Sequence, residues 1–400
     1  MSTQSRPLPL LAALCLAVAC GDRGLEEPSS PGGLPGEQPV AGAMGFVEAP
    51  GAGMDGMLRD GTALPVDGAR RWPAPMYEPA ERVDFDNVTL LGEAPTMDLP
   101  EPPRSGFRIV LPVREVAPGE EWEGCIALPY PEFEHRNVYH ARIYTSGALH
   151  HSNLVGVQHD GRPSSYPSCP PGTGDSIQIA LDSFLSNSPI DILFANSTQI
   201  DETEEIVFKP QTAYKVRTAG AEVLADAHYL NTGFEPVHSE VVYDFFTMPD
   251  EQVVHTLGAM VVHDQSFRVE AGTDKDVSND CATQSRGHLV SIMPHAHERT
   301  VDFTVDIMGG GHIDEVFSSG VFGGESKITV FDEPIPLSDA RIRQTCRMRN
   351  DLDRPIVYGT GQDEMCITFG YVTPATEAFV AYKLLPLTPC TTTRTGHLFE

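Results

Sequence analysis

The sequence predicts an all-β chain: two antiparallel β-sandwich (jelly-roll-like) domains that follow a disordered tether. Three observations support this prediction. Short alternating or wholly apolar runs recur, turns rich in Gly, Pro and Asn separate them, and helical periodicity is scarce. Such a series of short strands is typical of antiparallel sandwiches. The clearest runs are Phe107–Leu111, Val138–Tyr144, Tyr214–His228, Val241–Phe246 and Ile328–Phe331.

Residues 1–20 have the organisation of an export signal. Arg6 precedes the apolar stretch Leu8–Val18, which is too short to span a bilayer stably. The following Ala19-Cys20 resembles the end of a bacterial lipobox, so we expect cleavage before Cys20 and lipidation of its side chain. Acyl chains would then anchor the protein to a membrane surface. We predict an extracytoplasmic, membrane-anchored lipoprotein of a bacterial envelope, with plain secretion as the alternative.

The rest of the chain divides by composition into a tether and two domains. Residues 21–104 are crowded with Gly, Pro, Ala and Glu and show little apolar periodicity. Such a segment buries too little apolar surface to offset its ordering entropy, which predicts a flexible tether. The remaining length suits two domains. We place them at residues 105–249 and 250–400, with the boundary near Met248-Pro249-Asp250.

The charge balance excludes one class of partner. The chain carries 27 basic and 56 acidic side chains, a net charge of −29. We expect such a protein to be soluble and repelled by nucleic acid. The sequence contains no phosphate-cradling loop, nucleophile elbow or internal repeat. The acidity is typical of a solvated surface, with attraction of cationic substrates as the alternative.

Histidine spacing is the strongest indication of chemistry. His295 and His297 are two residues apart, so on a strand both side chains point to one face and reach one metal ion. The run Val301–Ile307 alternates apolar and polar residues, which indicates a half-buried strand. The two histidines share the parity of its apolar residues and are predicted to point into the fold.

Two further segments complete the candidate ligand set. The adjacent His150 and His151 would point to opposite faces of a regular strand, so joint binding of a metal requires a β-bulge or a strand end there. His228 stands alone, and Met365 directly precedes Cys366. Taken singly, each residue can be explained without a metal, the histidines as solvated side chains and Met365 as part of the core. Imidazole with thioether sulfur suits copper, because soft sulfur favours Cu(I). Surface or turn positions are predicted for His159, His238, His263 and His288.

Taken in order, these motifs resemble those of the copper type II, ascorbate-dependent monooxygenases, which include the peptidylglycine α-hydroxylating and dopamine β-monooxygenases. The resemblance covers roughly residues 105–392. It implies two β-sandwich domains, each with one copper ion, that face each other across a solvent-filled cleft. The matching segments are Leu149-His150-His151, Ala227-His228-Tyr229-Leu230-Asn231, His295-Ala296-His297, and Thr345-Cys346 leading to Asp363-Glu364-Met365-Cys366.

The resemblance also implies a role for each ligand. It implies two mononuclear copper sites: one transfers electrons, and the other binds dioxygen and hydroxylates a C–H bond of a small molecule. Ascorbate or another reductant supplies the electrons. The electron-transfer site falls on His150, His151 and His228, and the catalytic site on His295, His297 and Met365.

The cysteines indicate the compartment independently. Eight are present, and Cys15 and Cys20 lie in the export segment. The other six are even in number, as a disulfide framework in an oxidising compartment requires. Free thiols would also bind and reduce copper. A bridge is favoured over metal ligation for Cys366, because it would fix the backbone that presents Met365. The pairs that the resemblance implies are Cys125–Cys169, Cys281–Cys390 and Cys346–Cys366.

Substrate recognition departs from the peptidylglycine branch of the family. That branch has an arginine two residues before HxH, and an asparagine and a tyrosine two and four residues after the methionine ligand. This chain has Met293, Ile367 and Phe369 at those positions, which offer no charged partner for a peptide carboxylate. We therefore expect an apolar or aromatic small molecule rather than a peptidylglycine.

Two other classes of function fit part of the sequence. A non-catalytic copper-binding surface lipoprotein, for storage or delivery, needs the same ligands as the enzyme. A structural or adhesive surface protein needs only the sandwiches and the disulfides, and the six filled ligand positions argue against it. Asp363 and Glu364 are predicted either to orient ligands through hydrogen bonds or to be exposed loop charges.

Overall fold

The computed structural model confirms that the chain is all β. Within the part of the chain that it describes, regular structure consists of strands and short 3-10 turns, and no helix there is long and apolar enough to cross a membrane. The predicted export segment, the lipidation site Cys20 and the tether up to residue 94 lie outside the described residues. The structure describes residues 95–129, 135–158, 190–195, 203–216, 221–309, 311–319, 328–359 and 362–398.

The strands that precede residue 249 form two sheet layers. Strands β3, β9, β5 and β6 make a four-stranded sheet in that order, while β1, β11, β4 and β8 lie side by side in a larger sheet and β7 pairs with β4. Their bounds are β1 (Gly106–Val110), β2 (Arg114–Val116), β3 (Glu121–Pro129), β4 (Asn137–Thr145), β5 (Leu149–Gln158), β6 (Ile190–Phe194), β7 (Thr203–Val207), β8 (Thr212–Lys215), β9 (Ala221–Leu230), β10 (Val237–Ser239) and β11 (Val241–Met248).

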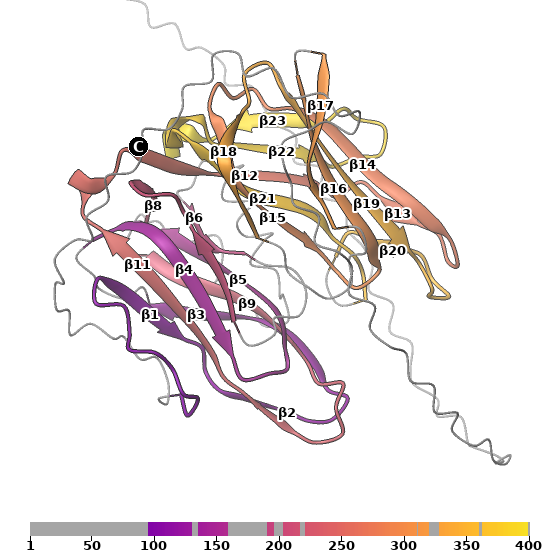
Figure 1. Cartoon of the computed structure of the whole chain (residues 1–400). Helices are drawn as coiled ribbons and strands as arrows, with labels where there is room; N and C mark the ends of the chain where they lie inside the picture. The colour runs from indigo at the N-terminus through magenta and orange to yellow at the C-terminus, as the bar shows by residue number, and fades with distance from the viewer. Residues whose placement is uncertain are drawn as a thin grey trace, which may run out of the picture. The chain divides into compact units, whose positions relative to one another are not determined.

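The strands after residue 249 repeat this organisation. Strands β14, β19, β16 and β17 form a second four-stranded sheet, and β12, β21, β15 and β18 continue the larger sheet. In Figure 1 the indigo-to-magenta strands and the orange-to-yellow strands form two sets. The bounds are η1 (Asp250–Gln252), β12 (His255–Asp264), β13 (Arg268–Val269), β14 (Asp274–Ala282), β15 (His288–Ala296), β16 (Thr300–Gly309), β17 (His312–Ser318), β18 (Thr329–Pro336), β19 (Arg341–Arg349), β20 (Ile356–Val357), β21 (Cys366–Thr373), η2 (Ala375–Glu377), β22 (Phe379–Lys383), β23 (Thr391–Arg394) and η3 (Gly396–Leu398).

One eleven-stranded sheet runs through both sets of strands in the described part of the chain. The link is the parallel pairing of β8 with β12, from Thr212 opposite His255 to Tyr214 opposite Leu257. The boundary predicted near Pro249 falls at η1, between β11 and β12. The two sandwiches therefore share a sheet, so the hydrogen bonds of one continue those of the other.

Strand β21 lies between two hydrophobic cores. All eight of its residues are buried. Ile367, Phe369 and Tyr371 pack into a core that contains many residues from before position 249, whereas Cys366 and Val372 pack into the core of the second sandwich. Burial of each large apolar side chain contributes about 1.5–3 kcal/mol. A strand buried on both faces reads as a nearly continuous apolar run, and β21 has such a sequence, CITFGYVT.

Two tyrosine side chains make contacts between the strands before residue 249 and the strands after it. The Tyr371 hydroxyl donates to the Ile192 carbonyl oxygen over 2.6 Å. Its ring stacks on Tyr214 with centroids 4.9 Å apart, and the Tyr214 hydroxyl donates to the Leu193 carbonyl oxygen over 2.7 Å. These bonds satisfy the hydroxyls that the packing buries. They fix the C-terminal strand β21 against β6 and β8 of the N-terminal half.

Two of the three expected disulfides are confirmed. Cys281 is bonded to Cys390, and Cys346 to Cys366. The second bridge joins β19 to β21 and so ties together the two sheets of the second sandwich. Beside it, Gln344 donates to the Cys366 carbonyl oxygen over 2.7 Å. The expected pair Cys125–Cys169 is not tested, because Cys169 lies outside the described residues.

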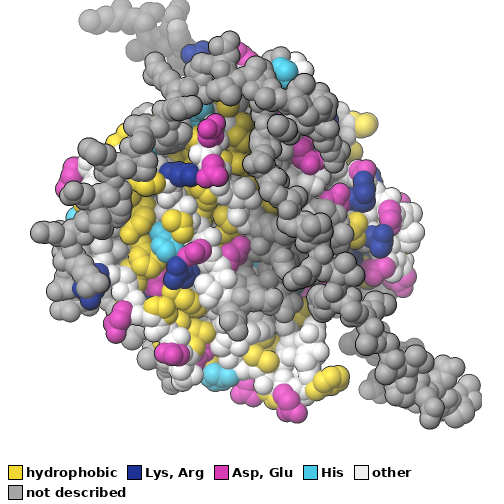
Figure 2. Space-filling model, in the orientation of Figure 1, with side chains coloured by type: hydrophobic (Ala, Val, Ile, Leu, Met, Phe, Trp, Pro, Cys, Tyr) yellow, Lys and Arg dark blue, Asp and Glu magenta, His cyan; other side chains and the backbone are white. Residues whose placement is uncertain are grey.

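Part of the surface acidity is balanced across strands. Figure 2 shows acidic side chains dispersed over the visible face rather than gathered in one patch. On β14 and β19, Asp280 lies 2.6 Å from Arg341, and Asp276 lies 3.1 Å from Arg347. Exposed pairs of this kind contribute at most about 1 kcal/mol each. This distribution is that of a solvated surface.

His263 does not occupy the predicted surface position. It is buried on β12, between the rings of Tyr382 and Tyr358 at 6.1 and 6.5 Å. Burial lowers the pKa of His263 to about 4. The prediction for His263 was wrong because its strand is covered on both faces, which the local sequence did not reveal. His238 and His288 are exposed, as predicted, and His159 lies outside the described residues.

Replacing Cys346 and Cys366 together by alanine should lower the free energy of unfolding by about 3 kcal/mol, because the denatured chain regains loop entropy. Denaturant titration of the oxidised protein measures this loss. Affinity for the copper that the family resemblance implies should fall as well, since the bridge holds the backbone next to Met365. The double substitution of Cys281 and Cys390 is the matched control and should leave copper affinity unchanged. Equal copper affinities in both variants would contradict the role of the Cys346–Cys366 bridge.

Acid should destabilise the fold through His263. Its pKa of about 4 in the folded state lies below the ordinary value of about 6.5, so the unfolded chain binds more protons between these two pH values. The stability present above pH 6.5 is therefore lost as pH falls toward 4, by about 3 kcal/mol at pH 4. Between pH 7 and pH 4, denaturant titrations should show a loss of stability that is about 3 kcal/mol smaller in His263→Gln than in the wild type, because the other buried histidines still contribute. The exposed control His288→Gln should show the full wild-type loss.

Candidate metal centre

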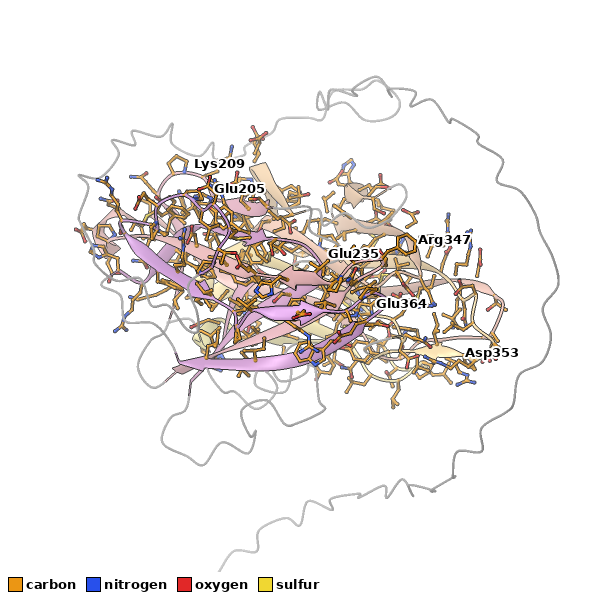
Figure 3. All side chains as sticks on the ribbon, turned by 90° about the horizontal axis from the view of Figure 1, so that it is seen from below. Glu205, Lys209, Glu235, Arg347, Asp353 and Glu364 are labelled. Carbon is orange, nitrogen blue, oxygen red and sulfur yellow. A yellow bond between two sulfur atoms is a disulfide. The ribbon has the colours of Figure 1, made fainter. Side chains whose placement is uncertain are left out.

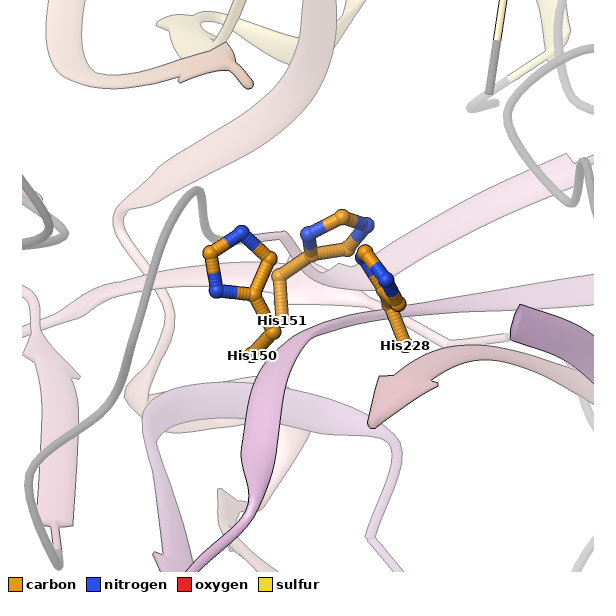
Figure 4. Close-up of side chains that lie close together, drawn as sticks. All are labelled: His150, His151 and His228. Atoms are coloured by element: carbon orange, nitrogen blue, oxygen red, sulfur yellow. The ribbon is translucent and has the colours of Figure 1, made fainter. Parts of the chain in front are cut away.

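Strands β5 and β9 bring three histidines together. His151 lies opposite His228 in the antiparallel pairing, and the register shifts between Leu149 and His151. Joint binding by His150 and His151 requires a β-bulge or a strand end, and this irregularity lies at the start of β5. The His150 and His151 rings are 5.4 Å apart, and each lies 5.0 Å from the His228 ring. Figure 4 shows the three rings gathered at one point.

Strands β15 and β21 present the second set. His295 lies opposite Ile367, and Ala296 opposite Cys366. His297 follows Ala296 and Met365 precedes Cys366, so each lies one residue beyond this paired register. Met365 is 1 % exposed and belongs to the core shared with the N-terminal half. Met365 therefore lies next to the strand ends paired through Ala296 and Cys366.

The two sets are in contact with each other. The His151 ring lies 5.1 Å from the His295 ring and 5.4 Å from the His297 ring. Ligand-capable nitrogens lie within 4.8 Å of one another in two groups, one of His150, His151 and His228, the other of His151, His295 and His297. The solvent-filled cleft implied by the family resemblance does not separate these rings. His151 belongs to both groups.

The environment keeps three of these imidazoles neutral. His151, His228, His295 and His297 are buried, and His150 is half-buried. Burial, followed by repulsion from neighbouring histidines, lowers the pKa of His150 and of His228 to about 4. The same two causes hold the pKa of His151 well below its usual range. At neutral pH each of these three rings has one N–H and one nitrogen with a free lone pair, which is the form that binds a metal.

Hydrogen bonds orient two of the rings. The His297 Nδ1–H donates to the Asp363 carbonyl oxygen over 2.9 Å, while its Nε2 is buried and has no hydrogen-bond partner. The His228 Nε2 lies 3.0 Å from a carboxylate oxygen of Glu121. A metal-binding histidine commonly donates its second N–H to a carbonyl or carboxylate in this way. The orphaned Nε2 of His297 and the orphaned Nδ1 of His151 fit a metal ion.

Glu364 holds the turn that carries His297. Its carboxylate accepts from the His297 backbone N–H at 3.0 Å, the Arg299 backbone N–H at 2.7 Å and the Thr300 hydroxyl at 3.0 Å. The side chain is fully buried, and burial raises its pKa although its donors oppose that shift. In Figure 3 Glu364 lies in the same half of the ribbon as Arg347 and Asp353. Of the two sequence hypotheses for Glu364, ligand orientation is therefore the one that the contacts support.

Two features of the centre escaped the sequence reasoning. Glu121 is distant in sequence from every histidine motif, and its place beside His228 follows from the pairing of β3 with β9. His151 belongs to both groups of histidines because the strands before residue 249 pack against the strands after it. No local motif signals either feature, because both arise from strand pairing and packing between distant segments.

Comparison with known proteins identifies no family. No family model matches the chain, and no curated protein matches it. Among solved structures, the major capsid protein P2 of bacteriophage PM2 is 11 % identical, with a TM-score of 0.27, and the match covers 66 % of this chain and 97 % of that one. The structure of infectious bursal disease virus, Gx strain, is 10 % identical with a TM-score of 0.17, and the match covers 65 % of this chain and 69 % of that one. The structure of Macrobrachium rosenbergii nodavirus is 11 % identical with a TM-score of 0.16, and the match covers 75 % of this chain and 99 % of that one. These similarities are too low to bear on function.

Substituting Glu364 by glutamine should weaken copper binding about 10- to 100-fold, a loss typical of removing a group that orients a ligand. The amide keeps the shape but has one oxygen for three donors, so the turn at His297 loses part of its support. Titration against a chromophoric Cu(I) chelator measures the affinity. Glu298→Gln changes an exposed neighbour in the same turn and is the matched control. Indistinguishable affinities for the two variants would rule out the orienting role.

Proposed function

We propose that the protein is a copper-dependent monooxygenase that hydroxylates a C–H bond of a small molecule with dioxygen and a reductant such as ascorbate. The observation that carries the proposal is the convergence of five imidazoles from β5, β9 and the end of β15. Buried imidazoles are costly unless something satisfies their polar atoms. Metal ions in this cluster would do so.

The donor set favours copper over other metals. The two groups of convergent nitrogens contain histidine alone, and the thioether of Met365 belongs to the residue next to Cys366, the partner of Ala296. Mg²⁺ and Ca²⁺ require oxygen ligands, and zinc, which binds three histidines in some catalytic sites, takes Cys, His and carboxylate ligands rather than a thioether. Imidazole binds both oxidation states of copper, and thioether sulfur stabilises Cu(I). We therefore assign both sites to copper.

Each residue has a defined part in this proposal. His150, His151 and His228 would hold one copper ion, and His295, His297 and Met365 the other. Bound copper supplies electron storage at the first site and activation of dioxygen at the second. Glu121 and the Asp363 carbonyl keep the His228 and His297 rings in the tautomer that presents a lone pair.

The surroundings of the second site favour an apolar substrate. Met293 and Phe369 share its sheet face, and the Phe369 ring lies 6.2 Å from the His295 ring. Neither side chain can pair with a carboxylate. The expected substrate is therefore an apolar or aromatic small molecule and not a peptidylglycine. Ascorbate or another small reductant remains the proposed electron donor.

The proposed location is extracytoplasmic. The two disulfides, Cys281–Cys390 and Cys346–Cys366, are typical of an oxidising compartment. Together with the export signal and the lipidation motif at Cys20, they support a lipoprotein on a bacterial envelope, with plain secretion as the alternative. We propose contact with the membrane only through this N-terminal lipid.

A non-catalytic copper-binding lipoprotein is the second candidate. The observation in its favour is the burial of the proposed ligands. The side chains of His151, His295 and Met365 are each 1 % exposed. A closed centre suits storage or delivery, because bound copper is shielded from solvent. Both candidates require the same ligands, and they differ in whether dioxygen consumption is coupled to a product.

Copper stoichiometry with X-ray absorption tests the proposal on the purified full chain. We expect about two copper ions per chain, with sulfur ligation to Cu(I) that is lost in Met365→Ala. Met348→Ala removes a buried methionine of the second core and is the matched control. Absence of copper–sulfur ligation in the wild type would overturn the assignment of Met365.

Oxygen uptake then separates enzyme from carrier. With ascorbate and a panel of apolar aromatic compounds, the monooxygenase should consume dioxygen in step with a hydroxylated product. Copper binding without any coupled product across the panel would favour the storage or delivery protein.

A further inference from the structure

His263 is a buried histidine that the proposed metal centre does not use. Its side chain is 1 % exposed, and among the described residues its Nδ1 has no hydrogen-bond partner. A polar atom without a partner is uncommon in a protein interior, because its desolvation is not offset. A bound molecule that supplies a partner would offset it.

Strand pairing puts His263 in one row with a proposed copper ligand. His263 on β12 lies opposite Ile367 on β21, and Ile367 lies opposite His295 on β15. Directly paired residues of antiparallel strands point to the same face of a sheet. Neighbouring strands are about 4.8 Å apart, so the Cα atoms of His263 and His295 are about 10 Å apart. The two histidines therefore flank one apolar side chain on one face.

The sheet face beside this row is apolar. Phe369 lies two residues along β21 from Ile367 and is paired with Val261 on one side and Met293 on the other. Residues two apart on a strand share a face, and all four side chains belong to the same core. This surface suits an aromatic or aliphatic group, and His263 supplies a polar group at its edge.

Two tyrosines flank the His263 ring. Tyr382 on β22 is paired with His263, with ring centroids 6.1 Å apart, and the Tyr358 ring lies at 6.5 Å. Both tyrosines are half-buried, so His263 lies close to solvent although its own side chain is covered. A small molecule would reach His263 between these two rings.

The charge state of His263 selects the group that it can bind. Burial lowers its pKa to about 4, so the ring is neutral at pH 7. A neutral imidazole has one N–H donor and one lone pair. It matches a hydroxyl group, which both donates and accepts, and offers a carboxylate no charge.

We propose that His263 is a specificity-determining residue that binds a hydroxyl group of the substrate and directs the apolar remainder along Ile367 toward the copper site at His295. This inference rests on the proposed function and narrows its substrate class to apolar or aromatic molecules that carry a neutral hydroxyl group. His263 holds the substrate and transfers no proton to it.

Equilibrium dialysis of matched probes against the copper-free full chain tests this contact. Naphthol and naphthalene differ by one hydroxyl group, and naphthoate has a carboxylate in its place. Naphthol should bind about three- to tenfold more tightly than naphthalene, the factor expected for one neutral hydrogen bond, and also more tightly than naphthoate. Equal affinities for naphthol and naphthalene, or tighter binding of naphthoate, would overturn the proposal.

Substitutions of His263 separate recognition from a structural role. His263→Phe keeps an aromatic ring and should abolish the preference for naphthol while naphthalene still binds, because the buried hydroxyl loses its partner. His263→Asn keeps a polar atom bonded to Cγ, as Nδ1 is, and should restore part of the preference. The exposed control His288→Phe should behave as the wild type. An equal loss of affinity for both probes in His263→Phe would indicate a packing role and overturn the proposal.

Copper loading tests the orientation of the bound probe. Cu(II) accelerates the nuclear magnetic relaxation of protons close to it, so in the loaded full chain the naphthol protons farthest from the hydroxyl should relax fastest. Uniform relaxation of all naphthol protons would overturn the proposed orientation and leave the copper function intact. A chain that binds no copper would overturn the proposed function and the direction toward copper, whereas the preference of the copper-free chain for naphthol would still identify His263 as a binding residue.

Discussion

The parallel pairing of β8 with β12 is the constraint on which the metal centre depends. It continues one sheet from the N-terminal strands into the C-terminal strands. The face of β21 that meets the N-terminal core, anchored by Tyr371, then lies against the strands that carry the first histidines. Without this pairing, the HH and HxH motifs would belong to two separate surfaces. The hydrogen bonds between β8 and β12 thus determine which histidines come together.

Burial gives these ligands their chemical state. Removal from water favours the neutral imidazole, and each histidine added to the cluster raises the cost of a proton on its neighbours. The same burial leaves nitrogens such as Nε2 of His297 without a partner. An arrangement that is unfavourable for the empty protein therefore becomes favourable when a soft cation binds. Folding and metal binding are linked in this way.

Support for the ligands comes from rigid elements around them. Glu364 fixes the turn after β15, and the bridge from Cys346 to Cys366 fixes the start of β21. The ligands themselves lie at strand ends or at a bulge, where the backbone departs from regular pleating. Such positions allow adjacent side chains such as His150 and His151 to converge. The regular strands behind them hold that irregularity in place.

The sequence by itself determined the strand content, the disulfides Cys281–Cys390 and Cys346–Cys366, and the candidate histidines, because periodicity, cysteine count and motif order are local or family-level signals. It also required a bulge or a strand end at His150 and His151 for joint metal binding, since adjacent side chains of a regular strand diverge. Tertiary structure alone decided that His263 is buried, that Glu121 meets His228, and that His151 contacts both ligand sets. Each of these depends on which distant strands pair, and residue order does not encode that pairing locally.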